Sequence, residues 1–371
     1  MELKFKKPDY SDCTAGIPNS IAEFYGIEKK GRISPLTSSI LKDTDADNIV
    51  VFILDAMGKN VLDGNLEEDG FLRSHVRGYI SSVFLSSTVP STVSLMTGLL
   101  PKDHLWLGWD TYFPEIDENV SVFTNTVKDT SEPAAKFNVA RTFTPYEDLI
   151  GRLNKSGMEA YYSMPFGPPF PQDLDCICER IRDLTKKPGR KYIYAYWSEP
   201  DGTFHEKGCF GPDAKKIMKD LEDKMEEFSG ELKNTLLLIT ADHGHIDITG
   251  TCIRRYPEIM KCLVRLPSLE ARAMSFYVKE GMEDVFEKEF KKEFGDTFVL
   301  LKTEEAIRQG FYGEGEVSER FKEKLGQYLS YATTELTLFT KEEDVSIYKG
   351  YHGGLTEDEM TVPLIAVECR G

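Results

Sequence analysis

The sequence predicts an α/β fold in which a largely parallel central sheet is flanked by helices and a smaller α+β lobe is inserted late in the chain. Three observations predict this fold. Apolar and β-branched runs alternate with helix-like stretches, as in parallel sheets. Several runs are apolar throughout, as expected for strands covered on both faces. After residue 266 the pattern changes to short strands and Lys/Glu-rich helices.

Six apolar runs are predicted to form the strands of the central sheet. In chain order they cover residues 48–54, 79–85, 158–163, 191–197, 235–240 and 361–368. The runs at 48–54 and 235–240 are almost uninterrupted by polar residues, so we expect them to be central strands. The polar stretches between the runs are predicted to be the covering helices.

The predicted inserted lobe covers residues 267–341, which leaves 1–266 and 342–371 as a catalytic core. Within the lobe, we expect short strands at 274–278 and 298–301, and helices at 284–294 and 318–328. The charged runs of these helices are typical of solvated faces stabilised by i,i+4 pairs. No pattern in the lobe indicates a specificity.

Composition and charge exclude several kinds of partner and location for the protein. The 371 residues include 62 acidic and 45 basic side chains, and the net charge of −17 argues against nucleic acid polymers and anionic membranes as partners. No apolar run reaches the ~20 residues of a membrane helix, and no secretory signal opens the sequence. Seven scattered cysteines indicate reduced thiols. We therefore expect a soluble, cytoplasmic protein; the sequence does not indicate its oligomeric state.

Residues that can bind metal ions follow three of the predicted strands and precede the last one. Functional groups of open parallel sheets gather beyond the carboxyl ends of the strands. Taken singly, each residue has a plain alternative, because an Asp can cap a helix and a lone His is often a loop residue. Together they offer enough oxygen and nitrogen ligands for two metal ions. The candidates are Asp55, Asp201, His205, Asp242, His243 and His352.

The histidines concentrate at these places. The chain has only six, and three of them are among the candidate ligands. His75, His104 and His245 are left over, although His245 stands beside Asp242 and His243 after the same strand. Metal binding explains this concentration better than core packing does.

A nucleophile is predicted in the hydroxyl-rich segment 86–98. This segment follows the second predicted strand and opens a helix whose N-terminus can attract anions. Helix capping is the alternative for any one of its Ser or Thr side chains. The residue types alone do not single out Thr88.

The ordered set of motifs resembles the alkaline phosphatase superfamily and is most similar to its nucleotide pyrophosphatase/phosphodiesterase branch. The resemblance covers residues 48–250 and the segment from 350 onward, but hardly the insert. It is carried by Asp55, Thr88-Val89-Pro90, Glu199-Pro200-Asp201 with His205, Asp242-His243-Gly244, and His352-Gly353.

The resemblance implies a ligand set and a reaction. One Zn²⁺ would be held by Asp201, His205 and His352, and a second by Asp55, Asp242 and His243, with Mn²⁺ as the alternative metal. Thr88 would be the nucleophile, and a phosphothreonine intermediate would form. The implied activity is hydrolysis of phosphodiester or pyrophosphate bonds in a small phosphate ester, for which a nucleotide is a candidate. His104 is expected to be structural.

Two positions depart from the branch's pattern. The branch usually has Asn directly after Thr-x-Pro, where this chain has Ser91, and a second Asn at the position of Trp109, which Asp110 follows. We take Ser91 and Trp109 as candidate substrate contacts. The rival activities on the same scaffold are a phosphomonoesterase, a phosphonoacetate-type hydrolase and a phosphomutase. A metal-stabilised binding protein without turnover is the non-enzymatic alternative.

Overall fold

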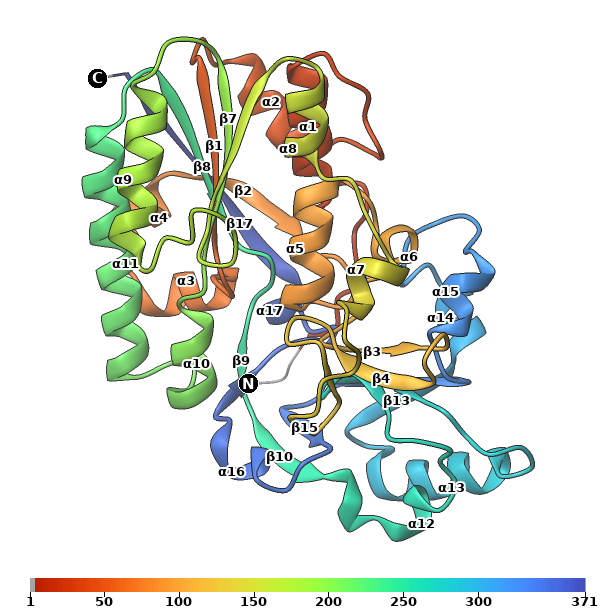
Figure 1. Cartoon of the computed structure of the whole chain (residues 1–371). Helices are drawn as coiled ribbons and strands as arrows, with labels where there is room; N and C mark the ends of the chain where they lie inside the picture. The colour runs from red at the N-terminus through yellow and green to blue at the C-terminus, as the bar shows by residue number, and fades with distance from the viewer. Residues whose placement is uncertain (1–3, 371) are drawn as a thin grey trace.

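The computed structural model, which describes residues 4–370, is built around a six-stranded sheet in the order β2-β17-β8-β1-β7-β6 (Figure 1). β1 pairs in parallel with β7 and β8, and β6 pairs in parallel with β7. β17 is antiparallel to both of its neighbours, but the other five strands run in one direction, so the sheet is largely parallel, as predicted. The strands are β1 (Asn48–Leu54), β2 (Val76–Ser81), β6 (Glu159–Ser163), β7 (Lys191–Trp197), β8 (Thr235–Thr240) and β17 (Thr361–Cys369).

Helices cover both faces of this sheet, which explains the apolar runs. Every residue of β1 and β8 is buried. Figure 1 shows α9 and α11 on one side of the sheet and α1, α5 and α8 on the other. These helices are α1 (Gly16–Phe24), α5 (Thr88–Thr97), α8 (Leu149–Lys155), α9 (Leu174–Thr185) and α11 (Pro212–Glu231). A strand that is covered on both faces has no solvent side, so polar alternation is absent.

The predicted strand at 79–85 is wrong in its position, because β2 covers Val76–Ser81. Residues 82–85 are fully buried but leave the sheet on the way to α5. The Ser82 N–H still donates to the carbonyl of Met360 at 2.7 Å, beside β17, and the chain then bends at Phe84 and Leu85 before α5 begins. The apolar content of Val83-Phe84-Leu85 thus indicates burial and not a strand.

A second, antiparallel sheet has the strand order β13-β14-β12-β11-β3-β4-β5. The helix α13 (Glu283–Phe294) packs three phenylalanines of one face against it, Phe286, Phe290 and Phe294. The strands are β3 (Asp110–Phe113), β4 (Glu118–Ser121), β5 (Thr126–Val127), β11 (Ser268–Glu270), β12 (Ala273–Phe276), β13 (Phe298–Lys302) and β14 (Tyr328–Ala332).

The sheet differs from the predicted lobe in two respects. Strands β3, β4 and β5 come from a segment that precedes residue 267, so the sheet takes strands from both sides of the predicted boundary. The predicted helix at 318–328 is wrong in length: α15 covers only Glu319–Glu323, and Tyr328 begins a strand. The domain limits of 267–341 stay a prediction.

Short elements complete the fold, and a two-stranded ribbon among them bears on the site. In this ribbon β9 (Ile246–Asp247) pairs antiparallel with β16 (Gly350–Tyr351). The other elements are α2 (Pro35–Lys42), α3 (Lys59–Asn65), α4 (Phe71–Ser74), α6 (Pro101–His104), α7 (Val139–Phe143), α10 (Asp201–Lys207), β10 (Thr249–Cys252), a 3₁₀ turn (Ile253–Arg255), α12 (Pro257–Met260), α14 (Thr303–Arg308), β15 (Leu336–Phe339), α16 (Asp344–Ile347) and α17 (Glu357–Met360).

Two expectations about the whole chain can be compared with the structure. All seven cysteines lie within the described residues and are unpaired. Over residues 4–370, no helix combines the length and the apolar character that crossing a membrane requires.

Candidate metal centre

The predicted ligands converge because their strands are neighbours. Asp55 follows β1 directly, and Asp242 and His243 follow β8, so parallel pairing brings these side chains to one edge of the sheet. Asp201 opens α10 shortly after β7, and His205 lies four residues later on the same face of that helix. His352 follows β16 and completes the set from the far end of the chain.

One ligand group surrounds Asp201. Nε2 of His205 lies 3.3 Å from Asp201 Oδ2, and Nε2 of His352 lies 3.6 Å from Asp201 Oδ1. Nε2 of His245 lies 3.5 Å from the same Oδ1 atom. The ligand atoms of these four residues all lie within 4.8 Å of one another. His245, which the predicted ligand set omits, therefore belongs to this group.

The second group surrounds His243. Its Nε2 lies 3.3 Å from Oδ1 of Asp55 and 3.5 Å from Oδ2 of Asp242. The ligand atoms of Asp55, Asp201 and His243 all lie within 4.8 Å of one another. Asp242 contacts His243 but lies outside that tighter group. Asp201 belongs to both groups, so the two groups are contiguous.

In each predicted histidine ligand, the outer ring nitrogen, Nδ1, which faces away from the carboxylates, donates a hydrogen bond to a backbone carbonyl. A carbonyl only accepts, so each Nδ1 carries a proton, and Nε2 is the atom that would bind a metal ion once the ring is neutral. This is how histidines are oriented in metal sites. The three bonds join His205 to Gly350 at 3.0 Å, His243 to Gly244 at 3.0 Å and His352 to Ser86 at 3.2 Å.

Asp55 and Asp242 each have one carboxylate oxygen that accepts hydrogen bonds from the protein and one that does not. The Tyr196 hydroxyl donates to Asp55 Oδ2. The backbone N–H groups of Ala56 and His243 donate to Asp242 Oδ1 at 3.2 and 3.0 Å. Their other oxygens, and Oδ1 of Asp201, are buried without a hydrogen-bond partner. Buried unpaired acceptors are unfavourable, so the structure leaves a place for cations.

The donor set and its spacing fit divalent metal ions. Two ligands of one tetrahedral Zn²⁺, each about 2.1 Å from the metal, lie roughly 3.4 Å apart. The contacts between imidazole and carboxylate in both groups run from 3.3 to 3.6 Å. Imidazole and carboxylate ligands suit Zn²⁺, and Mn²⁺ accepts the same types.

The electrostatics of the site without metal favour a cation. Burial raises the pKa of Asp55, and the carboxylates of Asp242 and Asp201 raise it further. Burial opposes a charge on His243, but Asp242 and Asp55 raise its pKa to about 10. Burial lowers the pKa of His352, and His243 lowers it further. A proton on His243 thus partly compensates the carboxylates, and a bound metal would displace it.

Thr88 lies beside the second ligand group. It is the first residue of α5, and its Oγ1 lies 3.2 Å from Nε2 of His243. No side chain caps this helix N-terminus, and Pro90 has no N–H to direct outward. The first amides of a helix lack intrahelical acceptors and attract anions. A hydroxyl, an anion-binding helix end and the ligand groups therefore meet at one point.

The two predicted substrate contacts differ in their exposure to solvent. Ser91 is fully buried, and its hydroxyl donates to the backbone carbonyl of Asp242 at 2.7 Å, so it helps to fix the end of β8. Trp109 is 41% exposed, and its ring centroid lies 5.7 Å from that of Phe123 in a T-shaped arrangement. That these two residues contact the substrate stays a prediction.

Glu270 is a buried site residue that sequence reasoning missed. It accepts hydrogen bonds from the hydroxyl of Ser87, next to Thr88, and from the N–H of Trp109 at 2.8 Å. Burial raises its pKa to about 7. It lies at the end of β11 in the second sheet, and a lone Glu there gives no signal in the sequence.

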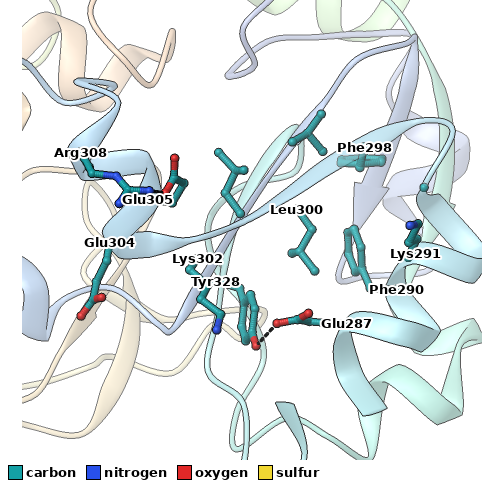
Figure 2. Close-up of a pocket in the computed structure, with 13 residues that line it drawn as sticks. Glu287, Phe290, Lys291, Phe298, Leu300, Lys302, Glu304, Glu305, Arg308 and Tyr328 are labelled. Carbon is teal, nitrogen blue, oxygen red and sulfur yellow. Dashed lines mark hydrogen bonds and ion pairs between the residues drawn. The ribbon is translucent and has the colours of Figure 1, made fainter. Parts of the chain in front are cut away.

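A groove elsewhere in the molecule contains none of these residues. It has a volume of about 850 Å³ and lies along β13, between α13 and α14 (Figure 2). Two pairs of its polar side chains contact each other, Tyr328 with Glu287 at 2.6 Å and Arg308 with Glu305. Because none of the metal-ligand groups lines it, we do not assign the chemistry to this groove.

Fold and site together define an alkaline phosphatase-like protein with clustered Asp and His side chains at the carboxyl edge of its sheet. The chain belongs to the type I phosphodiesterase / nucleotide pyrophosphatase family, whose model matches residues 49–359. This confirms the branch that the sequence motifs indicated.

Relatives of known structure support the fold. Human ectonucleotide pyrophosphatase/phosphodiesterase family member 5 is 24% identical over 182 residues, which are 46% of this chain and 38% of the human protein. Structures of human and murine ectonucleotide pyrophosphatase/phosphodiesterase 5 have TM-scores of 0.67 and 0.66, at 16% identity. An inactive threonine-to-alanine variant of the murine protein, in complex with AMP, has a TM-score of 0.65. Each covers 86% of this chain and 87% of the relative.

Proposed function

We propose that this protein hydrolyses phosphodiester or pyrophosphate bonds in a small phosphate ester, with Thr88 as the nucleophile. The observation that carries the proposal is the 3.2 Å contact of Thr88 Oγ1 with Nε2 of His243, at the edge of two contiguous ligand groups. Membership of the phosphodiesterase family supports the reaction class. The AMP complex of the murine relative supports a nucleotide as the substrate.

The ligand groups would hold two metal ions, Zn²⁺ by preference and Mn²⁺ as the alternative. Asp201, His205 and His352 would bind one ion, and Asp55, Asp242 and His243 the other. Such ions, when bound, neutralise phosphoryl oxygens and lower the pKa of a nearby hydroxyl. They also explain how an anionic substrate approaches a chain with a net charge of −17.

Thr88 would act in two displacements at phosphorus. Its oxygen attacks the phosphoryl group while the bond to the leaving-group oxygen breaks, which forms a phosphothreonine. Water then attacks the same phosphorus and releases the threonine oxygen. The free amides at the N-terminus of α5 would stabilise negative charge on the phosphoryl oxygens. Two inversions give net retention of configuration at phosphorus.

The test compares a bis-aryl phosphate diester with the aryl monoester, using Zn²⁺-loaded wild type and Thr88→Ala. We expect a strong preference for the diester and a loss of at least about 10³-fold in Thr88→Ala. Thr97→Ala is the matched control, because Thr97 lies on the same helix and its hydroxyl bonds only to backbone at 2.7 Å. Monoester preference would favour a phosphomonoesterase, and full activity of Thr88→Ala would refute the nucleophile.

A further inference from the structure

We infer that His245 is a fourth protein ligand of the metal ion held at Asp201, together with His205 and His352. The inference rests on the metal centre of the proposed function and extends its ligand set. It changes the site from one carboxylate and two imidazoles to one carboxylate and three imidazoles.

The position of the His245 side chain is that of a ligand. Its Nε2 lies 3.5 Å from Oδ1 of Asp201, which is within the range of the other contacts in the group. Both atoms are buried without a hydrogen-bond partner. The ring centroid lies 4.7 Å from that of His205 and 5.4 Å from that of His352. Three imidazoles thus surround one carboxylate.

The backbone places His245 there through the ribbon of β9 and β16. Ile246 pairs with Tyr351 in this ribbon, so continuing the register by one residue sets His245 opposite His352. Gly350 leaves the room for the ring, because a Cβ there would lie 2.7 Å from Cε1 of His245. The carbonyl of the same glycine accepts from Nδ1 of His205. The ribbon therefore positions all three histidines.

The outer nitrogen of His245 has a partner, as those of the other ligands do. Sγ of Cys209 lies 3.3 Å from Nδ1. A thiol sulfur is a weak acceptor, so it can accept a hydrogen bond from an Nδ1–H group of His245. With the proton on Nδ1, the lone pair of Nε2 faces Asp201.

A second buried histidine shows what a purely structural role looks like. The N–H of Trp106 donates to Nδ1 of His104 at 3.1 Å, and Nε2 of His104 lies 3.1 Å from Oγ of Ser94. Both ring nitrogens of His104 are therefore satisfied, as buried polar atoms usually are. His245 is equally buried but leaves Nε2 unsatisfied toward a carboxylate. Packing alone does not account for that arrangement.

A four-ligand group has consequences for binding. Four protein ligands fill a tetrahedral Zn²⁺ site, which is the arrangement of tightly held zinc. We therefore expect the ion at Asp201 to bind more tightly than the ion at His243. A metal that also accepts a substrate oxygen there would need a fifth position.

The test measures metal binding to the full chain directly. Zn²⁺ affinity is obtained by competition with a chromophoric chelator, metal content by elemental analysis, and the ligand environment from the visible spectrum of the Co²⁺-loaded protein. His245→Phe keeps the ring and removes both nitrogens. His245→Gln is the second variant, should the first not fold. Cys209→Ser is the matched control, because it alters only the outer contact.

The expected results separate a ligand from an outer contact. Each His245 variant should lower the Zn²⁺ affinity of the Asp201 site by more than about 100-fold and change the Co²⁺ spectrum. Cys209→Ser should lower that affinity by at most about 10-fold. Folded His245 variants with wild-type affinities and spectrum would overturn the inference, as would a wild type that binds neither metal. Thr88-dependent hydrolysis would then still uphold the proposed function. If metal binding depended on His245 but the protein showed no turnover, the inference would hold and the proposed function would not.

Discussion

The Tyr196 hydroxyl donates a hydrogen bond to Oδ2 of Asp55 and leaves Oδ1 of that carboxylate free toward His243. The bond fixes the rotation of a side chain that we assign to the second metal ion. Tyr196 lies near the end of β7, which pairs with β1, and Asp55 directly follows β1. The neighbouring strand thus orients the ligand.

Tyr196→Phe is predicted to weaken the second metal site. Oδ2 of Asp55 would lose its donor, and we expect about a 10-fold lower affinity at that site and a loss of about 1–3 kcal/mol in unfolding free energy. Chelator competition and urea unfolding measure the two effects. Tyr194→Phe is the control, because the buried Tyr194 hydroxyl has no hydrogen-bond partner. If both variants lose affinity equally, the orienting role is refuted.

Gly350→Ala is predicted to disturb the ligand group at Asp201. The added methyl would lie 2.7 Å from the His245 ring, so the ring or the ribbon must shift. We expect a loss of about 1–3 kcal/mol in unfolding free energy together with weaker metal binding. Gly230→Ala serves as the comparison, since nothing lies within 4 Å of the methyl on α11, and it should be neutral or stabilising. Unchanged metal affinity in Gly350→Ala would contradict the prediction.

Glu359→Gln is predicted to be strongly destabilising. The buried Glu359 carboxylate binds Nε of Arg272 at 2.7 Å and accepts from the N–H of Gly354 at 2.8 Å, just after His352. Breaking a buried pair leaves an uncompensated charge, at a cost of about 3–5 kcal/mol. Glu342→Gln, in an exposed pair with Arg255, should cost less than about 1 kcal/mol. Thermal unfolding compares them, and similar losses would disprove the difference.

His104 is predicted to reduce stability in acid. Burial lowers its pKa from 6.5 to about 3. Between these pH values the unfolded chain binds a proton at His104 that the folded chain does not. The free energy of unfolding is therefore unaffected by the titration of His104 above pH 6.5 and decreases by about 1.4 kcal/mol per pH unit below it. Urea unfolding from about pH 7.5 to about pH 4.5 should give a shallower decline in His104→Gln. Identical slopes would show that His104 does not contribute.

The strands were predictable where the chain is covered on both faces. The expected limits of β1, β7 and β8 agree with the structure, because every residue of these strands except Trp197 is buried. The strand predicted at 79–85 was wrong in its position because residues 83–85 are apolar and buried but form no strand. The strands between residues 110 and 127 gave too short a signal, since they depend on pairing such as that of Asp110 with Leu269.

The site was predictable as far as it depends on strand ends. Parallel pairing alone brings Asp55 close to Asp242, and a helix turn brings Asp201 close to His205. His245 stood out in the residue pattern after β8, but the ligand set of the resembling family omits it. Glu270 depends on contacts with Ser87 and Trp109, which lie 183 and 161 residues away, and no local pattern indicates such contacts.

Asp201 belongs to both ligand groups, so two ions bound at these groups would be coupled energetically. Whatever factor the first ion imposes on the affinity of the second, the second must impose on the first, because binding free energies around a cycle sum to zero. A titration of the apoprotein should therefore depart from two independent binding steps. The shared carboxylate would make a two-metal centre a cooperative unit in which neither ion has a single intrinsic affinity.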